Sequence, residues 1–455
     1  MNRREFLAKS AVAAAAGFAL PAFTSCVSSG RSLVRRPAPS GRINLGVIGY
    51  GTIATTTVPN FLSDDRVQVV AIADPVSDMP HYGEKKGQWR GGRLVGAQAV
   101  EKYYAEFRPA GTFKGCRVYE DFRAMLDRED LDAVYIATPD HWHCAMALLA
   151  ARKGKHIYCQ KPLALTVGEG RRIADAAQAA GITFQVGSQQ RSMEYFRRAC
   201  ELVRNGRLGR IQEIVVGYPG GNRDWSGLAV QQAPQPVPPE MNWDLWLGPA
   251  PVHPYAPALH PMNWRYHFDF GGGWMTDWGA HQIDIVQWAL GADATGPVAL
   301  ENVTASIPPP GAFFNTANDF AYDLVYADGV RAKVSNRHRK GLLFKGENGR
   351  TLFVERSAFE SNPESLRRER PGPGELHLPE SHLQEGNFID CIYRGRPPIT
   401  PAETGHRSIT PSHLANIAIR LGRSRLRWDP AAERVIGDDE ANRMLSRPMR
   451  RPYAV

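Results

Sequence analysis

The 455-residue chain lacks several features that would place it in a specialised class. Its six cysteines include no Cys-x-x-Cys pair, which argues against a zinc site held by cysteines. Beyond the first 26 residues, no apolar run is long enough to cross a bilayer. The net charge is +9, but the basic residues form no block with interleaved aromatics and no nucleic-acid-binding motif. We therefore expect a globular protein that does not bind nucleic acid.

The first 26 residues have the pattern of an export signal. Residues 2–9 (Asn-Arg-Arg-Glu-Phe-Leu-Ala-Lys) place paired arginines before Phe-Leu, and the apolar residues 11–20 follow. This order is typical of a bacterial signal peptide, and the adjacent arginines favour the twin-arginine export machinery. Residues 23–26 (Phe-Thr-Ser-Cys) resemble a lipoprotein cleavage site, although phenylalanine is not its favoured first residue. We expect a periplasmic or exported protein; a lipid anchor at Cys26 and a cytosolic chain remain alternatives.

Cysteine usage does not indicate a disulfide scaffold. If Cys26 carries a lipid, an odd number of cysteines remains, at wide and irregular spacing. Disulfide-rich domains instead have an even number of closely spaced cysteines. The five remaining residues are expected to be free: Cys116, Cys144, Cys159, Cys200 and Cys391.

Strands and helices alternate over residues 41–190, after a linker at 27–40. Strand-like runs occur at 42–49, 67–73, 131–137, 155–159 and 182–186, and helical segments at 52–62, 144–153 and 166–180. Such alternation predicts a doubly wound parallel sheet, the Rossmann dinucleotide-binding fold. Residues 76–115 interrupt the pattern and are interpreted as a polar insertion.

The pattern changes over residues 191–430. Strand-like runs at 211–218, 320–326 and 331–336 follow one another without regular helices between them, which predicts a mainly antiparallel sheet. We assign this region to a substrate and oligomerisation domain and residues 431–455 to a C-terminal tail. The tail carries four arginines that we interpret as a solvated basic surface: Arg443, Arg447, Arg450 and Arg451.

A glycine-rich turn follows the first strand and predicts a nucleotide site. It has the pattern G-x-G-x-x-A and comprises Gly49, Tyr50, Gly51, Thr52, Ile53 and Ala54. The glycines permit a tight turn and close approach to a pyrophosphate, which the N-terminus of the next helix attracts. Asp74 ends the second strand, where a carboxylate accepts the ribose hydroxyls of NAD and repels the 2′-phosphate of NADP. A turn-forming role for Asp74 is the alternative.

Further motifs follow in a fixed order along the chain. They are residues 138–143 (Thr-Pro-Asp-His-Trp-His), 154–163 (Gly-Lys-His-Ile-Tyr-Cys-Gln-Lys-Pro-Leu), 271–284 (Gly-Gly-Gly-Trp-Met-Thr-Asp-Trp-Gly-Ala-His-Gln-Ile-Asp), 405–408 (Gly-His-Arg-Ser) and 441–445 (Ala-Asn-Arg-Met-Leu). Together these motifs resemble the Gfo/Idh/MocA family of nicotinamide-dependent oxidoreductases. The resemblance implies an N-terminal Rossmann domain and a C-terminal α/β domain with a large open, mainly antiparallel sheet. It also implies a homo-oligomer.

The resemblance assigns the catalytic lysine to Lys161. It lies in Gln160-Lys161-Pro162, where the family has Glu-Lys-Pro, and the departure removes a carboxylate beside the lysine. Lys161 is expected to stabilise the oxygen of the reacting hydroxyl. Proline after the lysine is consistent with a cis bond. Further cofactor contacts implied by the resemblance are Thr138, Pro139, His143 and Gln160.

Asp277 and His281 match the family's acid–histidine pair. Together with Asp284 they are spaced i, i+4 and i+7, so on a helix they share one face. His281 is the expected general base or acid, because its ordinary pKa of ~6.5 permits proton exchange near neutrality. Asp277 is expected to orient it. A metal held by these residues is the alternative, but no zinc-type cluster supports it, and we expect no metal.

The expected reaction is hydride transfer between bound NAD and a hydroxyl carbon of a sugar, glycoside or polyol. An exported enzyme has no nicotinamide pool, so the cofactor is expected to be tightly held. The alternatives are a redox-neutral, NAD-dependent glycoside hydrolase and a non-enzymatic sugar-binding protein. Side chains that we consider for substrate contact are His141, Trp142, Arg191, Trp264, Arg265 and Trp274.

Overall fold

The computed structural model describes residues 41–80, 82, 90–107, 115–220 and 224–455. The expected export signal and linker lie outside these residues. Among the described residues, no helix combines the length and apolarity needed to cross a membrane. All five cysteines in this part of the chain are free and buried, which confirms the expectation that they form no disulfide scaffold.

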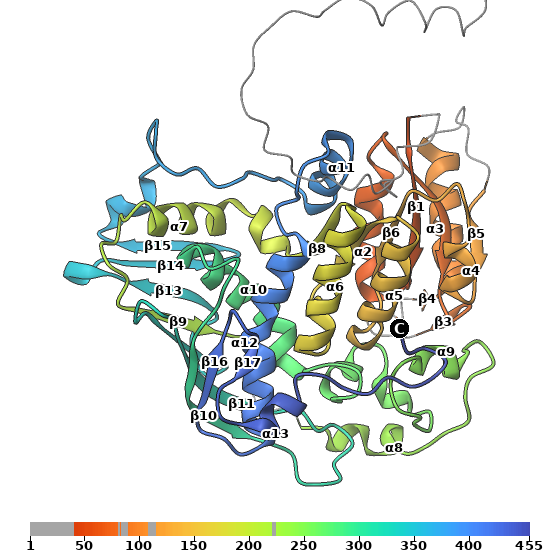
Figure 1. Cartoon of the computed structure of the whole chain (residues 1–455). Helices are drawn as coiled ribbons and strands as arrows, with labels where there is room; N and C mark the ends of the chain where they lie inside the picture. The colour runs from red at the N-terminus through yellow and green to blue at the C-terminus, as the bar shows by residue number, and fades with distance from the viewer. Residues whose placement is uncertain (1–40, 81, 83–89, 108–114, 221–223) are drawn as a thin grey trace, which may run out of the picture. The chain divides into compact units, whose positions relative to one another are not determined.

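The N-terminal half forms a six-stranded parallel sheet in the order β5-β2-β1-β6-β7-β8 (Figure 1). Its strands are β1 (Ile43–Ile48), β2 (Val67–Ala73), β5 (Arg117–Tyr119), β6 (Ala133–Ile136), β7 (His156–Gln160) and β8 (Phe184–Gly187). Its main helices are α2 (Thr52–Leu62), α3 (Arg93–Phe107), α4 (Phe122–Leu126), α5 (Asp140–Arg152) and α6 (Val167–Ala180). This confirms the expected Rossmann fold.

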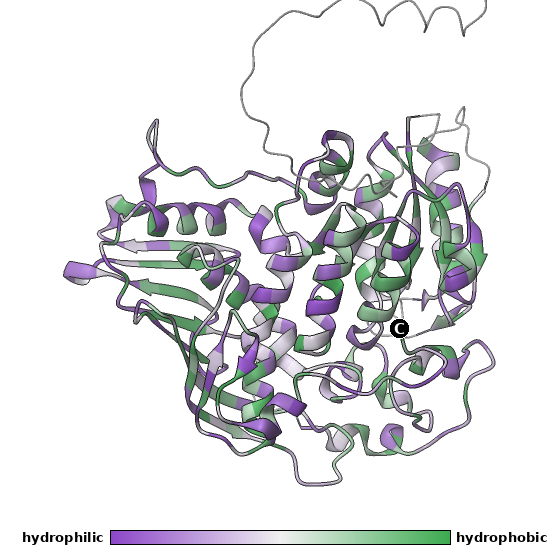
Figure 2. Ribbon diagram, in the orientation of Figure 1, coloured by the Kyte–Doolittle hydropathy of each residue, from purple (hydrophilic) through white to green (hydrophobic). Residues whose placement is uncertain are grey.

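Both faces of this sheet are buried, which explains the continuous apolar runs of its strands. In β1, Leu45 and Val47 belong to the cluster beneath α2 and α3, whereas Ile48 belongs to the cluster beneath α5 and α6. Figure 2 shows the strands of this sheet coloured mostly as hydrophobic. The carboxyl ends of the strands meet at one edge, where ligands bind in folds of this kind.

The region interpreted as a polar insertion contains a regular helix. Residues 76–115 include the short strands β3 (Met79–Pro80) and β4 (Arg90–Gly91) as well as α3. One stripe of α3 is buried on β2, with Val100 and Tyr104 in the core, and the Tyr104 hydroxyl accepts the amide of Val69 at 2.9 Å. The insertion interpretation was wrong for this segment because α3 buries only a narrow stripe and is otherwise polar.

The C-terminal half forms a nine-stranded sheet in the order β15-β14-β13-β9-β12-β11-β10-β16-β17. Its strands are β9 (Glu213–Gly217), β10 (Ala299–Ser306), β11 (Asp319–Val325), β12 (Arg331–Ser335), β13 (Gly341–Lys345), β14 (Thr351–Glu355), β15 (Ala358–Asn362), β16 (Leu426–Asp429) and β17 (Arg434–Val435). All neighbours pair antiparallel except β9 and β12, which are parallel. The expected mainly antiparallel sheet is therefore confirmed.

Helices lie between these strands in sequence, contrary to the pattern that we inferred. Beside this sheet lie α7 (Glu194–Arg204), α10 (Gly273–Leu290) and α12 (Ala402–Arg420) (Figure 1). In β12, Ala332 and Val334 are buried in the cluster shared with these helices. The intervening Lys333 is exposed and pairs with Glu213 at 2.5 Å. One face of the sheet therefore contacts helices and the other carries paired charges.

The last residues of the chain contact both the parallel domain and α9 (Trp243–Leu247). Arg447 forms an ion pair with Glu169 at 2.6 Å, and Arg450 forms one with Asp244 at 2.6 Å. Tyr453 is buried and donates its hydroxyl proton to Asp244 at 2.6 Å. The interpretation of these arginines as a solvated surface was therefore wrong for Arg447 and Arg450, which attach the tail to the folded core.

Arg191 lies at the junction of the two sheets. It follows β8 and is fully buried, with its guanidinium 2.8 Å from Asp284 of α10 and 2.7 Å from Asp293. The Ser408 hydroxyl of α12 also donates to Asp284, at 2.6 Å. The sequence-based assignment of Arg191 to substrate contact was wrong, because its guanidinium is buried and pairs with the carboxylates of Asp284 and Asp293.

Replacing Arg191 with methionine should destabilise the fold strongly. The buried carboxylate of Asp284 would lose its counter-ion, a loss that costs about 3–5 kcal/mol. The matched control is Arg331→Met, which breaks an exposed pair with Glu301 and should cost less than ~1 kcal/mol. Urea unfolding measures both. Equal shifts in the two variants would show that the buried ion pair does not stabilise this junction.

Candidate active site

A cleft opens at the carboxyl ends of β1, β2, β6 and β7. The parallel domain contributes the glycine turn, the end of β2 and Lys161. The opposite wall comes from α9 (Trp243–Leu247) and the segment that follows it. It contributes Leu245, Trp246, His260, Pro261, Trp264 and Arg265. The cleft is thus built from both halves of the chain, at the edge of the sheet where dinucleotides bind in this class of fold.

The glycine turn leaves room and hydrogen-bonding groups for an anion. Gly49 has φ +87°, and a Cβ there would lie 2.9 Å from the carbonyl oxygen of Ala137, so only glycine fits. The following helix α2 begins without a side-chain cap, and the buried hydroxyl of Thr52 has no partner in the described structure. An uncapped helix start with an orphaned hydroxyl fits a pyrophosphate.

Asp74 supports the glycine turn from the end of β2. Its Oδ2 accepts the amide of Tyr50 at 2.7 Å, and its Oδ1 accepts the amide of Val76 at 2.8 Å. Burial raises the pKa of Asp74 to about 6. Asp74 also lines the cleft, together with Glu120, so its predicted contact with ribose hydroxyls stays a prediction. The turn-forming alternative also describes part of what this carboxylate does.

Lys161 lies at the end of β7, before a cis bond to Pro162. Its Nζ is 2.7 Å from Oδ1 of Asp277 and 3.1 Å from the carbonyl oxygen of the same residue. The Nε of Arg265 lies 3.1 Å from that same Oδ1. The structure thereby places the predicted lysine and aspartate in direct contact across the two domains.

The electrostatics of this contact keep Asp277 ionised. Burial alone would raise its pKa, but Lys161 and Arg265 outweigh burial and hold the pKa well below its ordinary value. The carboxylate is therefore negative throughout the neutral range. Its charge offsets one of the two adjacent cations.

His281 lies one turn further along α10 and does not form the expected pair with Asp277. Oδ1 of Asp277 contacts both Lys161 and Arg265, and the buried Nδ1 of His281 has no partner in the described structure. Burial, aided by the charge of Lys161, lowers the pKa of His281 well below its ordinary value. No hydrogen bond joins the two side chains among the described residues, so the expected orientation of His281 by Asp277 stays a prediction. The structure leaves a neutral imidazole with an unpartnered nitrogen.

Asp140 is a cleft residue that the sequence reasoning missed. It begins α5, is buried, and lines the same cleft as Lys161. Burial, together with the negative charge of Asp277, raises the pKa of Asp140 to about 8, although the positive charge of Arg265 opposes the rise. A carboxylic acid that keeps its proton at neutral pH can donate a hydrogen bond. The signal was its position after Thr138-Pro139, where a helix start follows a strand end.

Gln160 is held by two neighbours in the wall of the cleft. Its Nε2 donates to the hydroxyl of Tyr135 at 2.9 Å, and its Oε1 accepts from Gln189 at 3.3 Å. Gln160 itself lines the cleft, as do Thr138 and Pro139. The side chain is therefore fixed by hydrogen bonds suited to an amide, and the carboxylate nearest to Lys161 comes from Asp277 instead.

The remaining predicted residues divide between the cleft and its support. Trp142, Trp264 and Arg265 line the cleft, and the Arg265 guanidinium lies over the Trp264 ring at 4.3 Å. Three others do not line it. His143 contacts the carbonyl oxygens of Thr138 and Pro162 with its ring nitrogens, His141 contacts that of Trp246, and Trp274 packs edge-on against Tyr266 and Trp278.

Two family models match the chain. One is described as "Oxidoreductase family, NAD-binding Rossmann fold" and matches residues 91–188. The other is described as "Oxidoreductase family, C-terminal alpha/beta domain" and matches residues 196–455, more than half of the chain. Both belong to the Gfo/Idh/MocA group, in agreement with the resemblance drawn from the motifs.

Curated relatives are similar over part of their length. Levoglucosan dehydrogenase of Pseudarthrobacter phenanthrenivorans is 28% identical over 202 residues, which cover 43% of this chain and 44% of that protein. The alpha-N-acetylgalactosaminidase of Shewanella oneidensis is 31% identical over 228 residues, 48% of this chain and 45% of that protein. The chain therefore spans less than half the length of these relatives.

Solved structures share the fold over most of the chain. Aldose-aldose oxidoreductase from Caulobacter crescentus, complexed with glycerol, has a TM-score of 0.59 at 20% identity and covers 85% of this chain and 99% of its own. WlbA dehydrogenase from Bordetella pertussis, in complex with NADH and UDP-GlcNAcA, has a TM-score of 0.60 at 19% identity and covers 86% and 99%. The chain belongs to the Gfo/Idh/MocA oxidoreductase family and has its NAD-binding Rossmann fold and C-terminal α/β domain.

Proposed function

We propose that the chain is an exported, NAD-dependent oxidoreductase that transfers hydride at a hydroxyl carbon of a sugar, glycoside or polyol. The observation that carries this proposal is the contact of Lys161 with Asp277, at 2.7 Å, in the cleft that contains the glycine turn. It brings a cationic hydrogen-bond donor to the sheet edge where the nucleotide is expected. The carbohydrate class is supported by the names of relatives such as levoglucosan dehydrogenase.

The residues of the cleft fit a dinucleotide. The uncapped start of α2 and the hydroxyl of Thr52 would hold its phosphates. The carboxylates of Asp74 and Glu120 line the cleft and disfavour a 2′-phosphate, so NAD is preferred to NADP. When bound, the nicotinamide supplies the hydride acceptor or donor.

Lys161 and His281 share the handling of the substrate's hydroxyl group. The ammonium group of Lys161, paired with Asp277, can donate a hydrogen bond to an oxygen that gains negative charge. His281 is neutral, so its unpartnered Nδ1 is able to accept a proton. Asp277 and Arg265 position the ammonium group. In this arrangement one side chain accepts the proton and another stabilises the oxygen.

Export places a demand on cofactor retention. The segment before residue 27 has the twin-arginine pattern, and a protein outside the cytoplasm has no nicotinamide pool to draw on. We propose a cofactor that remains bound and is returned to its starting state within the cleft by a second substrate. A lipid anchor at Cys26 and a homo-oligomer formed through the C-terminal sheet are part of the same proposal.

A redox-neutral glycoside hydrolase is the second candidate function. It is supported by the similarity to alpha-N-acetylgalactosaminidase and by Asp140, a buried acid in the cleft whose pKa is raised to about 8. A protonated carboxyl group can donate its proton to a leaving aglycone. Release of an aryl group from aryl glycosides without net NADH would favour this candidate, and Asp140→Asn should then abolish release.

The purified full-length chain should contain bound NAD. Its near-ultraviolet absorbance should change when a substrate sugar is added, because the reduced nicotinamide absorbs there and the oxidised form does not. Gly51→Ala is the matched variant. Its new Cβ would meet no atom closer than Tyr82 at 3.6 Å, so the fold should persist while a methyl group obstructs the phosphates. A chain that neither contains nor binds NAD would contradict the proposal.

Replacing Lys161 with methionine should reduce turnover by about 10²–10⁴-fold, the range for loss of a positioned proton-handling group. Methionine retains most of the side-chain volume and removes the ammonium group. Steady-state rates with a substrate sugar measure the effect, and bound NAD should stay near the wild-type level. Lys153→Met, at an exposed pair with Asp127, is the control. Unchanged turnover in Lys161→Met would refute the assigned role.

Asp140 should make the fold less stable as the pH rises. Its pKa is raised from 3.8 to about 8, so the folded chain retains a proton that the unfolded chain releases near pH 3.8. The contribution of Asp140 to the free energy of unfolding is therefore complete below pH 3.8 and is lost as the pH rises to about 8. Urea unfolding of wild type and Asp140→Asn across this range should show a difference that grows with pH. A constant difference would contradict the buried, protonated state.

A further inference from the structure

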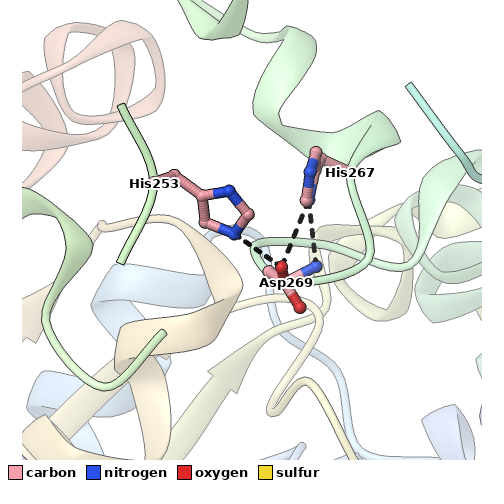
Figure 3. A group of neighbouring side chains, drawn as sticks. All are labelled: His253, His267 and Asp269. Atoms are coloured by element: carbon pink, nitrogen blue, oxygen red, sulfur yellow. Dashed lines mark hydrogen bonds and ion pairs between the residues drawn. The ribbon is translucent and has the colours of Figure 1, made fainter. Parts of the chain in front are cut away.

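Two histidines and one aspartate lie together outside the catalytic cleft. His253 follows α9, and His267 and Asp269 precede α10 (Figure 3). The Nε2 of His253 is 2.7 Å from Oδ2 of Asp269, and the Nδ1 of His267 is 3.8 Å from the same oxygen. One ring nitrogen from each histidine and one carboxylate oxygen all lie within 4.8 Å of one another. None of the three lines the cleft around Lys161.

This donor set suits a transition metal of the zinc type. Two imidazole nitrogens and one carboxylate oxygen are ordinary zinc ligands, with metal–ligand distances of ~2.0–2.2 Å. Ligand atoms around such an ion are therefore a few ångströms apart, and side-chain rotation is enough to close the present separations. Calcium and magnesium prefer sets made entirely of oxygens, which the two imidazoles exclude.

The surroundings leave one side of the cluster open. His267 is buried with 10% of its side chain exposed, whereas 29% of His253 and 37% of Asp269 are exposed. A metal could therefore enter from solvent, and a water molecule could complete a four-coordinate shell. The amide of Asp269 points to Nδ1 of His267 at 3.3 Å, a long contact that a metal would replace.

We propose that His253, His267 and Asp269 bind a divalent transition metal, zinc in particular. The sequence reasoning expected no metal. It considered residues around Asp277, whereas this set joins His253 to residues 14 and 16 positions further along the chain, which only the fold brings together. The proposal is independent of the hydride chemistry, because the cluster contacts neither Lys161 nor Asp277 through any interaction in the described structure.

The position of the cluster gives the metal a structural role. The backbone carbonyl of His253 accepts the indole N–H of Trp243, a residue of α9, at 2.7 Å. His267 and Asp269 belong to the turn that leads into α10, the helix that carries Asp277 and His281. A bound ion would join the wall of the cleft to the start of that helix. It would position catalytic groups without touching the substrate.

Zinc and cobalt binding to the untagged full-length chain tests the proposal. After chelation and dialysis, calorimetric titration with ZnCl₂ should show about one strong site per chain, and Co²⁺ should give visible absorption bands typical of tetrahedral coordination. Asp269→Asn and His253→Gln preserve side-chain volume and hydrogen bonding but remove metal-ligand character. Either variant should weaken zinc binding by more than ~100-fold. Replacing a residue that only hydrogen-bonds to a metal ligand typically weakens binding by ~10–100-fold.

His377→Ala is the matched control, because His377 is exposed and distant in sequence from the cluster. It should bind zinc like the wild type, and zinc should raise the melting temperature of both but not of Asp269→Asn. Absence of strong binding in the wild type would overturn the proposal. So would equal binding in wild type and Asp269→Asn, since the metal would then lie elsewhere. In either case the three residues form a hydrogen-bonded cluster only, and the hydride assays remain unaffected.

Discussion

The active site depends on how one helix, α10, is fixed against the parallel sheet. Two ion pairs do this: Lys161 after β7 with Asp277, and Arg191 after β8 with Asp284. The two aspartates are seven residues apart, so they lie on one face of the helix. The Arg191 pair is fully buried and cannot part without leaving a charge in the core. It therefore holds the helix in register, so that the more accessible Lys161 pair meets the cleft at a defined position.

The charged groups in and beside the cleft give Asp277, Asp140 and His281 different protonation states. Lys161 and Arg265 both contact Asp277, so this carboxylate is the one that ionises. Asp140 lines the same cleft and forms no ion pair with any residue that the structure describes, and its proton is retained. Burial, aided by the charges of Lys161 and Arg356, lowers the pKa of His281 well below its ordinary value and keeps it neutral. A cationic donor, Lys161, and a neutral acid, Asp140, thus line one cleft, and the neutral imidazole of His281 lies one helical turn beyond Asp277.

The sequence predicted the helices, strands and turns that have local signals, but it did not predict which distant residues form ion pairs in the folded chain. The glycine turn and its strand were predictable because the motif fixes the backbone over a few residues. Lys161, Asp277 and His281 were found by resemblance, but the partner of Asp277 was not, since its ion pair joins residues 116 positions apart. Arg191 was misassigned for the same reason. A basic residue near a predicted cleft looks the same in sequence whether it faces a ligand or a buried carboxylate.

The wall opposite the nucleotide site is stabilised by the end of the chain. Trp246 and Trp264 line the cleft from a segment that contains only short helices, which have little stability of their own. Asp244, in the same turn as Trp246, accepts hydrogen bonds from Arg450 and Tyr453. Tyr453 also packs edge-on against Trp142, another residue of the cleft. The C-terminal residues therefore contact both α9, through Asp244, and α5, through Trp142. The hydride transfer proposed for this site requires that water be excluded from the reacting groups, so this attachment would support the proposed reaction although none of the described tail residues lines the cleft.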